Sequence, residues 1–255
     1  MPHPSPPERA LHGLGDFGLF AGDVARAALR MRASSAEALR HARVLALRCV
    51  VPVCATIFPF GAVIGVQGMR ILDLVTAHRM LSSLLSVLVI RELGPVLAAV
   101  LVAAQGGSSF AAELGAMRIK EEIDATEVMA VDPLGWHVVP RVAAMAIVVP
   151  VLTVLADAFG IFGGYVVAVY QYGQSHGVFM TNLVELIGVF DLAASAFKGL
   201  CFGVLIGLVA SWRGYHASGG AAGVGRAVND TVVISVVSIL ALNYVLSSAL
   251  FGGVG

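Results

Sequence analysis

Acidic side chains gather in one segment of an otherwise apolar chain. Six of the sixteen acidic residues lie between Glu113 and Asp132. Overall, 58% of the 255 residues are hydrophobic and 13% are charged, which is about half the charged share of a soluble domain. A charged segment between two long apolar runs predicts a folded loop that stays in water and contacts another molecule.

The sequence contains no pattern for independent chemistry. A phosphate-binding P-loop requires Gly-Lys-[Ser/Thr], but the two lysines, Lys120 and Lys198, follow Ile119 and Phe197. Neither a Ser/His/Asp set nor a metal-ligand cluster stands out, so we expect no enzyme, cofactor or metal site. If transport uses ATP, the ATP and Mg²⁺ belong to a separate ATPase chain. The formal net charge of zero gives no reason to expect nucleic-acid binding.

One lysine lies inside an apolar run. Lys198 interrupts the segment 192–212, and a lysine at the centre of a membrane helix costs about 2.5–3.5 kcal/mol on insertion scales. We therefore expect Lys198 to face the helix bundle, with Glu92 as its first partner, Arg91 beside that partner and Asn243 as a neutral contact. Two interpretations stay open: a structural ion pair, or a charged element that rearranges during transport.

Five runs are long enough to span a bilayer, which takes roughly 20 apolar residues. They cover residues 49–66, 81–104, 138–170, 192–212 and 227–251. The predicted fold is all-α: a single polytopic membrane domain at 49–255, preceded by disordered residues 1–14 and an interfacial amphipathic helix at 15–48. Glycines spaced four apart, at 61/65, 160/164 and 199/203/207, predict close helix packing.

Lysine and arginine counts predict the orientation, because cytoplasmic loops carry more of them. Seven arginines precede the first span, three basic residues follow the second and two follow the fourth. These twelve lie on one predicted side, and only Arg70 and Arg79 lie on the other. The N-terminus and the acidic segment are therefore predicted to be cytoplasmic, and the C-terminus to be outside.

The acidic segment has a helical pattern. Ile119, Ile123, Thr126 and Ala130 form a narrow stripe at helical spacing along a predicted helix from Glu113 to Met129, which Asp132-Pro133 ends. Helices that lie on a membrane favour Lys and Arg on their polar face. This helix is mostly acidic, so a protein partner fits it better.

Several motifs together resemble the MlaE/YrbE permease family. They are RELGPVLAAVL (91–101), GSSFAAELGAMRIKEEIDATEVMAVDP (107–133), VVPR (138–141) and DAFGIFGG (157–164), and the resemblance extends over about residues 46–251. It implies a bacterial inner-membrane subunit of a lipid transporter, acting as a homodimer with a cytoplasmic ABC ATPase dimer and an external ring of MCE-domain proteins. A STAS-domain subunit can accompany the ATPase, and the implied cargo is phospholipid.

The resemblance also implies roles for individual residues. The acidic segment corresponds to the coupling helix that docks on the ATPase. Its candidate contact residues are Glu113, Arg118, Lys120, Glu121, Glu122, Asp124, Glu127, Met129 and Asp132. The candidate polar residues of a lipid pathway are Glu92, Arg91, Lys198, Asn243 and Gln105, where Gln105 replaces an arginine that many members have. Leu72, Leu74, Val75 and Met80 are candidates for a lipid cavity.

Other functions remain alternatives. A permease for a sterol or an organic solvent would show the same pattern of spans. A secondary transporter is expected to show an internal repeat and a midplane ion site, and we find no repeat. A non-transporting scaffold would explain the acidic loop but not Lys198.

Overall fold

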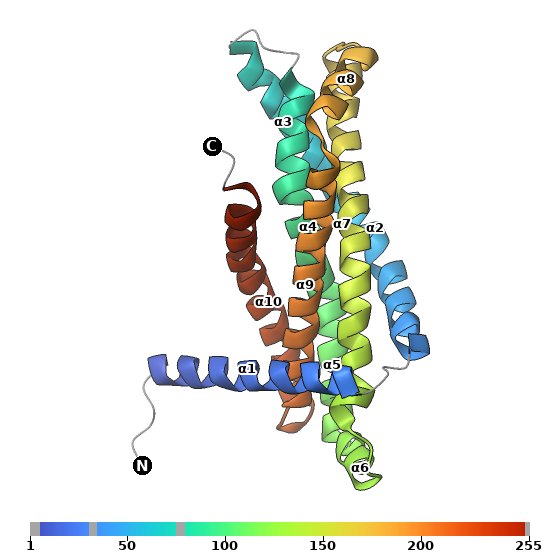
Figure 1. The fold of residues 1–255 in the computed structure, drawn as a ribbon, viewed down its shortest axis with the longest axis vertical. Helices are drawn as coiled ribbons and strands as arrows, with labels where there is room; N and C mark the ends of the chain where they lie inside the picture. Colours follow the sequence, from blue (N-terminus) through green and yellow to red (C-terminus); the bar gives the residue numbers. More distant parts are fainter. Residues whose placement is uncertain (1–5, 31–34, 75–79, 253–255) are drawn as a thin grey trace.

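The computed structural model describes residues 6–30, 35–74 and 80–252, and these residues form helices and no strands. Figure 1 shows a long bundle with one helix lying across its lower end. The α-helices are α1 (Pro6–Arg30), α2 (Ser35–Leu74), α3 (Leu81–Leu88), α4 (Gly94–Val102), α5 (Ser108–Ile119), α6 (Glu122–Val128), α7 (Val139–Val166), α8 (His176–Leu186), α9 (Val189–Tyr215) and α10 (Gly220–Phe251). Short π-helical segments join several of them: η2 (Val89–Leu93), η3 (Ala103–Gly107), η4 (Leu134–Val138) and η5 (Val167–Gln171).

The predicted all-α membrane fold is confirmed. Within the described residues, five helical stretches are long and apolar enough to cross a membrane: Ala36–Leu72, Leu81–Ile119, Leu134–Gln171, Val189–Tyr215 and Gly220–Phe251. Each contains one predicted span and extends beyond it, because the helices continue into polar residues at their ends. The sequence prediction missed α8, a short helix between the third and fourth spans.

The helix boundaries near the N-terminus differ from the predicted ones. Residues 6–14, predicted to be disordered, are the first turns of α1; proline is tolerated there because the first helical N–H groups have no intrahelical partner. The predicted interfacial helix at 15–48 is also divided between two elements. α1 ends at Arg30, and residues 35–48 belong to α2, which continues without a break into the first span.

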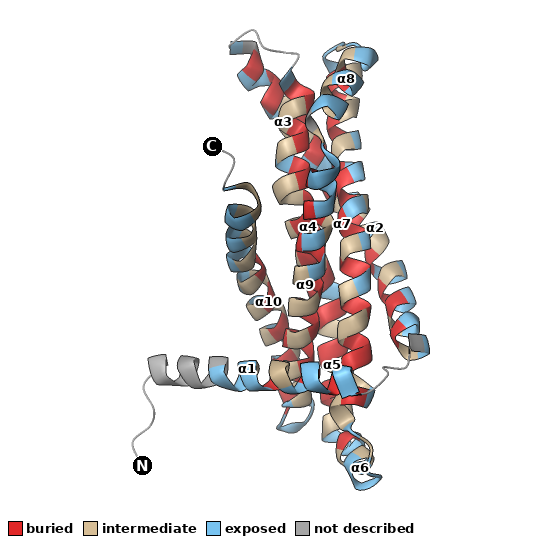
Figure 2. Cartoon of the chain, viewed as in Figure 1, coloured by how far each residue is buried: buried red, intermediate tan, exposed pale blue. Residues whose placement is uncertain are grey.

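Close glycine contacts join α2, α7 and α9. A Cβ atom at Gly61 of α2 would lie 1.9 Å from the carbonyl oxygen of Gly160 in α7, and one at Gly203 of α9 would lie 2.5 Å from the carbonyl oxygen of Met145. Both distances are too short for a side chain, so these glycines let the backbones approach. The buried residues of Figure 2 follow this three-helix layer.

The two ends of the bundle differ. One end carries α1, α6 and the turn between α9 and α10, and we call it the α6 end; α3 and α8 lie at the opposite, α8 end (Figure 1). α10 starts at the α6 end, where it packs on α5 and α9, and its upper half diverges from the bundle (Figure 1). It is the least buried of the five spans.

Candidate functional site

The acidic segment forms two short helices rather than the single predicted helix. α5 ends at Ile119 and α6 begins at Glu122, because Glu121 adopts a left-handed conformation with φ of 61° that no continuous α-helix allows. The side chain of Arg118 bridges the break by pairing with Asp124. Ile123 is fully buried and holds α6 on the bundle.

Most acids of this segment remain accessible. The exposed candidates are Glu113, Lys120, Glu121, Glu122, Glu127, Met129 and Asp132. Lys120 lies 3.9 Å from Glu122, a separation at which an exposed pair contributes little. Asp132 has a local role, because its carboxylate accepts the backbone N–H of Leu134 at 3.1 Å. The predicted stripe contributes only Ile123 to the core, since Ile119 and Ala130 are exposed.

Glu113 is separate from the other acids. Its carboxylate lies 3.4 Å from Arg141, whose guanidinium is largely buried at the start of α7. Arg141 also donates to the backbone carbonyl of His137 at 2.6 Å. Glu113 therefore fixes the base of the bundle, and the docking role that the resemblance implies for it stays a prediction.

Within the membrane-spanning part, polar groups converge on Lys198. The Nζ atom of this fully buried lysine donates to the carbonyl oxygen of Arg91 at 2.5 Å and to the hydroxyl of Ser247 at 2.7 Å. It also lies 3.3 Å from both Glu92 Oε1 and Asn243 Oδ1. Glu92 and Asn243 are thus next to Lys198, as the sequence predicted. We call Glu92, Lys198, Asn243 and Ser247 the Lys198 cluster.

Proline chemistry explains why a backbone carbonyl is available to Lys198. In an α-helix, the carbonyl of Arg91 would accept the N–H of residue 95, but Pro95 has none. The π-helical segment η2 passes this point, with the N–H of Gly94 bonded to the carbonyl of Val89. The lysine therefore bonds to a carbonyl whose usual α-helical donor is missing.

α10 supplies one polar face to the Lys198 cluster. Asn243 and Ser247 are four residues apart, and both donate to Glu92 at 2.7 Å. Phe251, four residues further along, places its ring centroid 5.5 Å from Lys198 Nζ and 4.6 Å from the guanidinium of Arg91. Sequence reasoning missed Ser247, although its spacing from Asn243 marks the same helical face.

Arg91 and Asp157 have partners that the sequence did not reveal. Arg91 does not pair with Glu92; its Nε atom donates to Asp191 at 2.8 Å. Asp191 also accepts the backbone N–H of Gly188 at 3.1 Å, so it caps α9. Asp157 is buried and accepts the hydroxyl of Ser195 at 2.6 Å, and its other oxygen fills the space where Gly94 has no side chain.

Gln105 lies away from the Lys198 cluster. It is exposed in η3 and lines a pocket of about 230 Å³ at the lower end of α2, together with Arg48 and Glu113. Its assignment to a lipid pathway stays a prediction. η3 directly follows the apolar residues of the second span, which places Gln105 at the edge of the membrane-spanning region.

The predicted lipid-cavity residues do not form one surface. Leu72 is buried in a packed cluster with Met69, Leu81 and Phe179, and its assignment to a lipid cavity stays a prediction. Leu74 and Met80 are exposed at the α8 end. Val75 lies outside the described residues.

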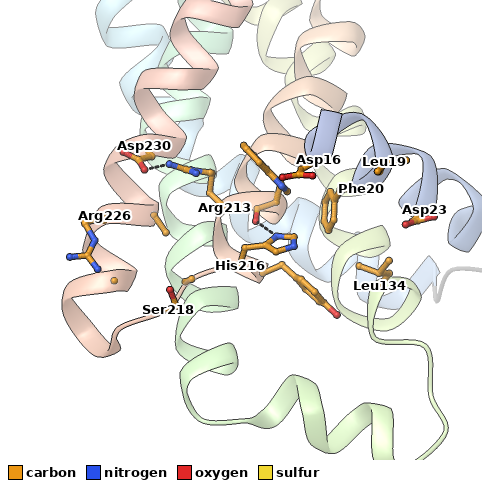
Figure 3. Close-up of a pocket in the computed structure, with 15 residues that line it drawn as sticks. Asp16, Leu19, Phe20, Asp23, Leu134, Arg213, His216, Ser218, Arg226 and Asp230 are labelled. Carbon is orange, nitrogen blue, oxygen red and sulfur yellow. Dashed lines mark hydrogen bonds and ion pairs between the residues drawn. The ribbon is translucent and has the colours of Figure 1, made fainter. Parts of the chain in front are cut away.

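A further pocket lies at the α6 end, between α1 and the turn that joins α9 to α10. It has a volume of about 590 Å³. Figure 3 shows Asp16 and Asp23 on its α1 side, Arg213 paired with Asp230, and Arg226 on α10. His216 bonds to the carbonyl of Trp212 at 2.9 Å and packs against Phe20 (Figure 3). The sequence had counted the two arginines only as indicators of orientation.

Comparisons with known proteins agree on one family. The family model described as Permease MlaE matches residues 38–249. A probable ABC transporter permease protein of Rickettsia felis is 32% identical over 238 residues, which cover 93% of this chain and 92% of the relative. The intermembrane phospholipid transport system permease protein MlaE of Haemophilus influenzae is 35% identical over 193 residues, covering 75% of this chain and 74% of the relative.

A plant protein is also similar. The protein named TRIGALACTOSYLDIACYLGLYCEROL 1, chloroplastic, of Arabidopsis thaliana is 32% identical over 195 residues, which cover 75% of this chain and 56% of the relative.

Proposed function

The chain belongs to the MlaE permease family and is a membrane permease of an ABC transporter, and on that premise we propose that it moves phospholipid between the inner membrane and the outer envelope. The observation that carries this proposal is the Lys198 cluster. It holds charge inside a membrane-spanning bundle, where charge is costly and marks function. The name of the Haemophilus influenzae relative supports phospholipid as the cargo.

In this proposal, the Lys198 cluster holds α10 against η2 through bonds that can be released. The lower part of α10 packs on α5 and α9, whereas its Asn243 and Ser247 bond to Glu92 of η2. Bonds of this kind can exchange partners without moving the packed layer of α2, α7 and α9. The phosphate of a lipid would compete with Glu92 for the lysine, so lipid entry would loosen α10 from the bundle.

A separate ATPase dimer supplies the energy and binds the ATP and Mg²⁺. Its proposed docking surface is α6 and the break before it, where Glu121, Glu122 and Glu127 are exposed on a helix that Ile123 fixes to the bundle. A rigidly held acidic helix can transmit a displacement, whereas a loose loop cannot. The excess of basic residues supports a cytoplasmic location for this end.

The remaining partners follow from the family. The permease forms a homodimer, and a ring of MCE-domain proteins binds the α8 end outside the membrane. A STAS-domain subunit accompanies the ATPase. The N-terminus is cytoplasmic and the C-terminus periplasmic.

Purification of the tagged protein from its native membrane tests this function. Mass spectrometry of the sample should identify an ABC ATPase and phospholipid. Reconstituted with fluorescent phospholipid in liposomes, the complex should move the lipid only with ATP. A purified complex without an ATPase would contradict the proposed energy source, and ATP-dependent movement of a sterol but not of phospholipid would contradict the cargo.

A further inference from the structure

A second polar pocket lies at the lower end of α2, and we define it as the Arg48 pocket. Its volume is about 230 Å³. One wall consists of α2 residues in the range 40–48, and the other consists of η3 and α5 residues in the range 105–113. The lining residues are Arg40, His41, Val44, Leu45, Arg48, Gln105, Gly106, Ser109, Phe110 and Glu113.

The pocket lies at the depth of lipid headgroups. Its α2 wall ends at Arg48, directly before the apolar run 49–66, and its η3 wall begins at Gln105, directly after the apolar run 81–104. Two spans running in opposite directions therefore mark the same boundary of the hydrocarbon region. The basic residues of this end place the boundary at the cytoplasmic leaflet.

Arg48 is the arginine of this pocket that has no carboxylate as an ion-pair partner among the described residues. Its guanidinium donates to the hydroxyl of Ser109 at 3.3 Å, and among the described residues it forms no ion pair. The other charges are compensated: Arg40 pairs with Glu37 at 2.5 Å, and Glu113 pairs with Arg141. A guanidinium with free N–H groups is well suited to bind a phosphate through two parallel hydrogen bonds.

The surroundings of Arg48 fit a lipid better than a soluble anion. Val44, Leu45 and Phe110 give the pocket an apolar wall. Val51, three residues after Arg48, lines a separate groove of about 450 Å³ further along α2, whose lining residues are all apolar. The groove is lined by Val50, Val51, Cys54, Ala55, Phe58 and Phe159. A polar pocket followed by an apolar groove along one helix matches a headgroup followed by an acyl chain.

We propose that the Arg48 pocket binds the phosphate of a phospholipid headgroup from the cytoplasmic leaflet, with Arg48 as the phosphate ligand. Gln105 offers further donors to the phosphodiester and glycerol oxygens, whereas the hydroxyl of Ser109 donates to Glu113 at 3.3 Å and orients Arg48. The acyl chain lies along the groove beside Val51. Basic pockets between membrane helices on the cytoplasmic side recognise headgroups in this way. This site is distinct from the Lys198 cluster and does not depend on the proposed transport function, since a permease for another cargo would still bind lipid here.

Photocrosslinking locates the site. The full-length protein in maltoside detergent is mixed with phosphatidylglycerol that carries a photoreactive diazirine in its headgroup, and the adducts are mapped by mass spectrometry. We expect adducts within 40–48 or 105–113. Diacylglycerol with the same diazirine, which lacks the phosphate, should give few adducts there. Equal labelling by both probes would overturn the assignment of a phosphate site.

Matched variants test the role of Arg48. Arg48→Gln should lower the adduct yield in these peptides about tenfold, the effect of losing one charged hydrogen-bonding group. Arg48→Lys should retain most of the yield. The control is Arg43→Gln, which removes an exposed arginine of the same helix that does not line the pocket and should leave the yield unchanged. Equal losses in the Arg43 and Arg48 variants would show a general surface charge effect and overturn the proposal.

Two further measurements distinguish loss of the site from misfolding, and a lipid ligand from a soluble phosphate ester. Gln105→Glu adds a negative charge at an exposed position, so the protein should fold normally and yet lose most of its adducts; retained labelling would contradict the site. Free glycerol 3-phosphate in a hundredfold excess should not displace the lipid probe. Full displacement would identify a site for a soluble phosphate ester and overturn the lipid assignment. Transport assays are not involved, so failure here leaves the proposed function unaffected.

Discussion

The Lys198 cluster and the α5–α6 segment both carry charge in an apolar chain, but they satisfy that charge differently. Lys198 is fully buried and has four acceptors from η2 and α10. The acids of α6 are mostly exposed, and their ion pairs are with basic residues close in sequence. Inside a membrane the protein must supply every partner, whereas water supplies them at the α6 end.

This difference indicates what each region can do. Because the bonds of Lys198 join separate helices, a change in its partners changes how those helices are held together. Because Glu121 and Glu127 are exposed, they are available to another protein, whereas Asp124 is paired with Arg118. The buried region is therefore suited to respond to cargo, and the exposed region is suited to dock a partner.

The largest expected effect on stability comes from Lys198. Lys198→Met removes the cation and leaves Glu92 without its charged partner, which should lower the free energy of unfolding by about 3 kcal/mol, as for other broken buried pairs. Thermal unfolding in detergent measures the change. Lys198→Ala should in addition abolish ATP-dependent lipid movement while the complex still assembles; normal transport by the assembled variant would leave Lys198 a purely structural role.

A double-mutant cycle isolates the pair. Glu92→Gln in the Lys198→Met background leaves no unpaired charge, so it should recover at least half of the lost stability. The side chain of Glu92 is 40% exposed, and water therefore stabilises part of its charge. Additive losses in the double variant would mean that Lys198 and Glu92 do not interact.

The membrane-spanning architecture could be predicted from the sequence because it depends on local composition. Five long apolar runs must be helices, since only helices and closed barrels satisfy their backbone in lipid. The break at Glu121 could not be predicted, because it depends on one residue adopting a left-handed conformation. The helical start at Pro6 differs from the expectation of disorder, which rested on proline content and on the terminal position.

The charged members of the buried polar contacts could be predicted from the sequence, but the serine members could not. Lys198 and Glu92 attracted attention as charges in apolar runs, and a buried charge requires a partner. Serine is common in membrane helices and carries no charge that would require a partner. The contact of Ser195 with Asp157 and that of Ser247 with Lys198 were therefore found only in the structure. Arg91 pairs with Asp191 of another helix rather than with Glu92. This pairing depends on how the two helices are oriented, and the periodicity of the sequence does not predict that orientation.

Alanine substitutions at two glycines should change stability by intermediate amounts and in opposite directions. Gly203→Ala in the bundle would place Cβ 2.5 Å from the carbonyl oxygen of Met145, so α7 and α9 must separate, at a cost of about 1–3 kcal/mol. Gly225→Ala, in α10 at the α6 end, has no atom within 4 Å of the added Cβ and should gain about 0.5–1 kcal/mol from helix propensity. Thermal unfolding of both variants measures the difference, and equal shifts would contradict the tight packing of α7 on α9.

The smallest effect on stability should come from the acids of α6, although their effect on coupling should be large. Replacing Glu121, Glu122 and Asp124 together by lysine changes exposed or half-exposed side chains, so each should alter stability by less than about 0.5 kcal/mol. The same triple variant reverses the charge of the proposed docking surface and should abolish lipid-stimulated ATPase activity of the reconstituted complex. Asp23→Lys in α1 is the control, because it reverses an exposed acid at the same end of the bundle but outside α6. Lipid-stimulated activity that survives the triple reversal would rule out α6 as the docking surface, whereas loss of activity in the control as well would attribute the effect to the overall charge of this end.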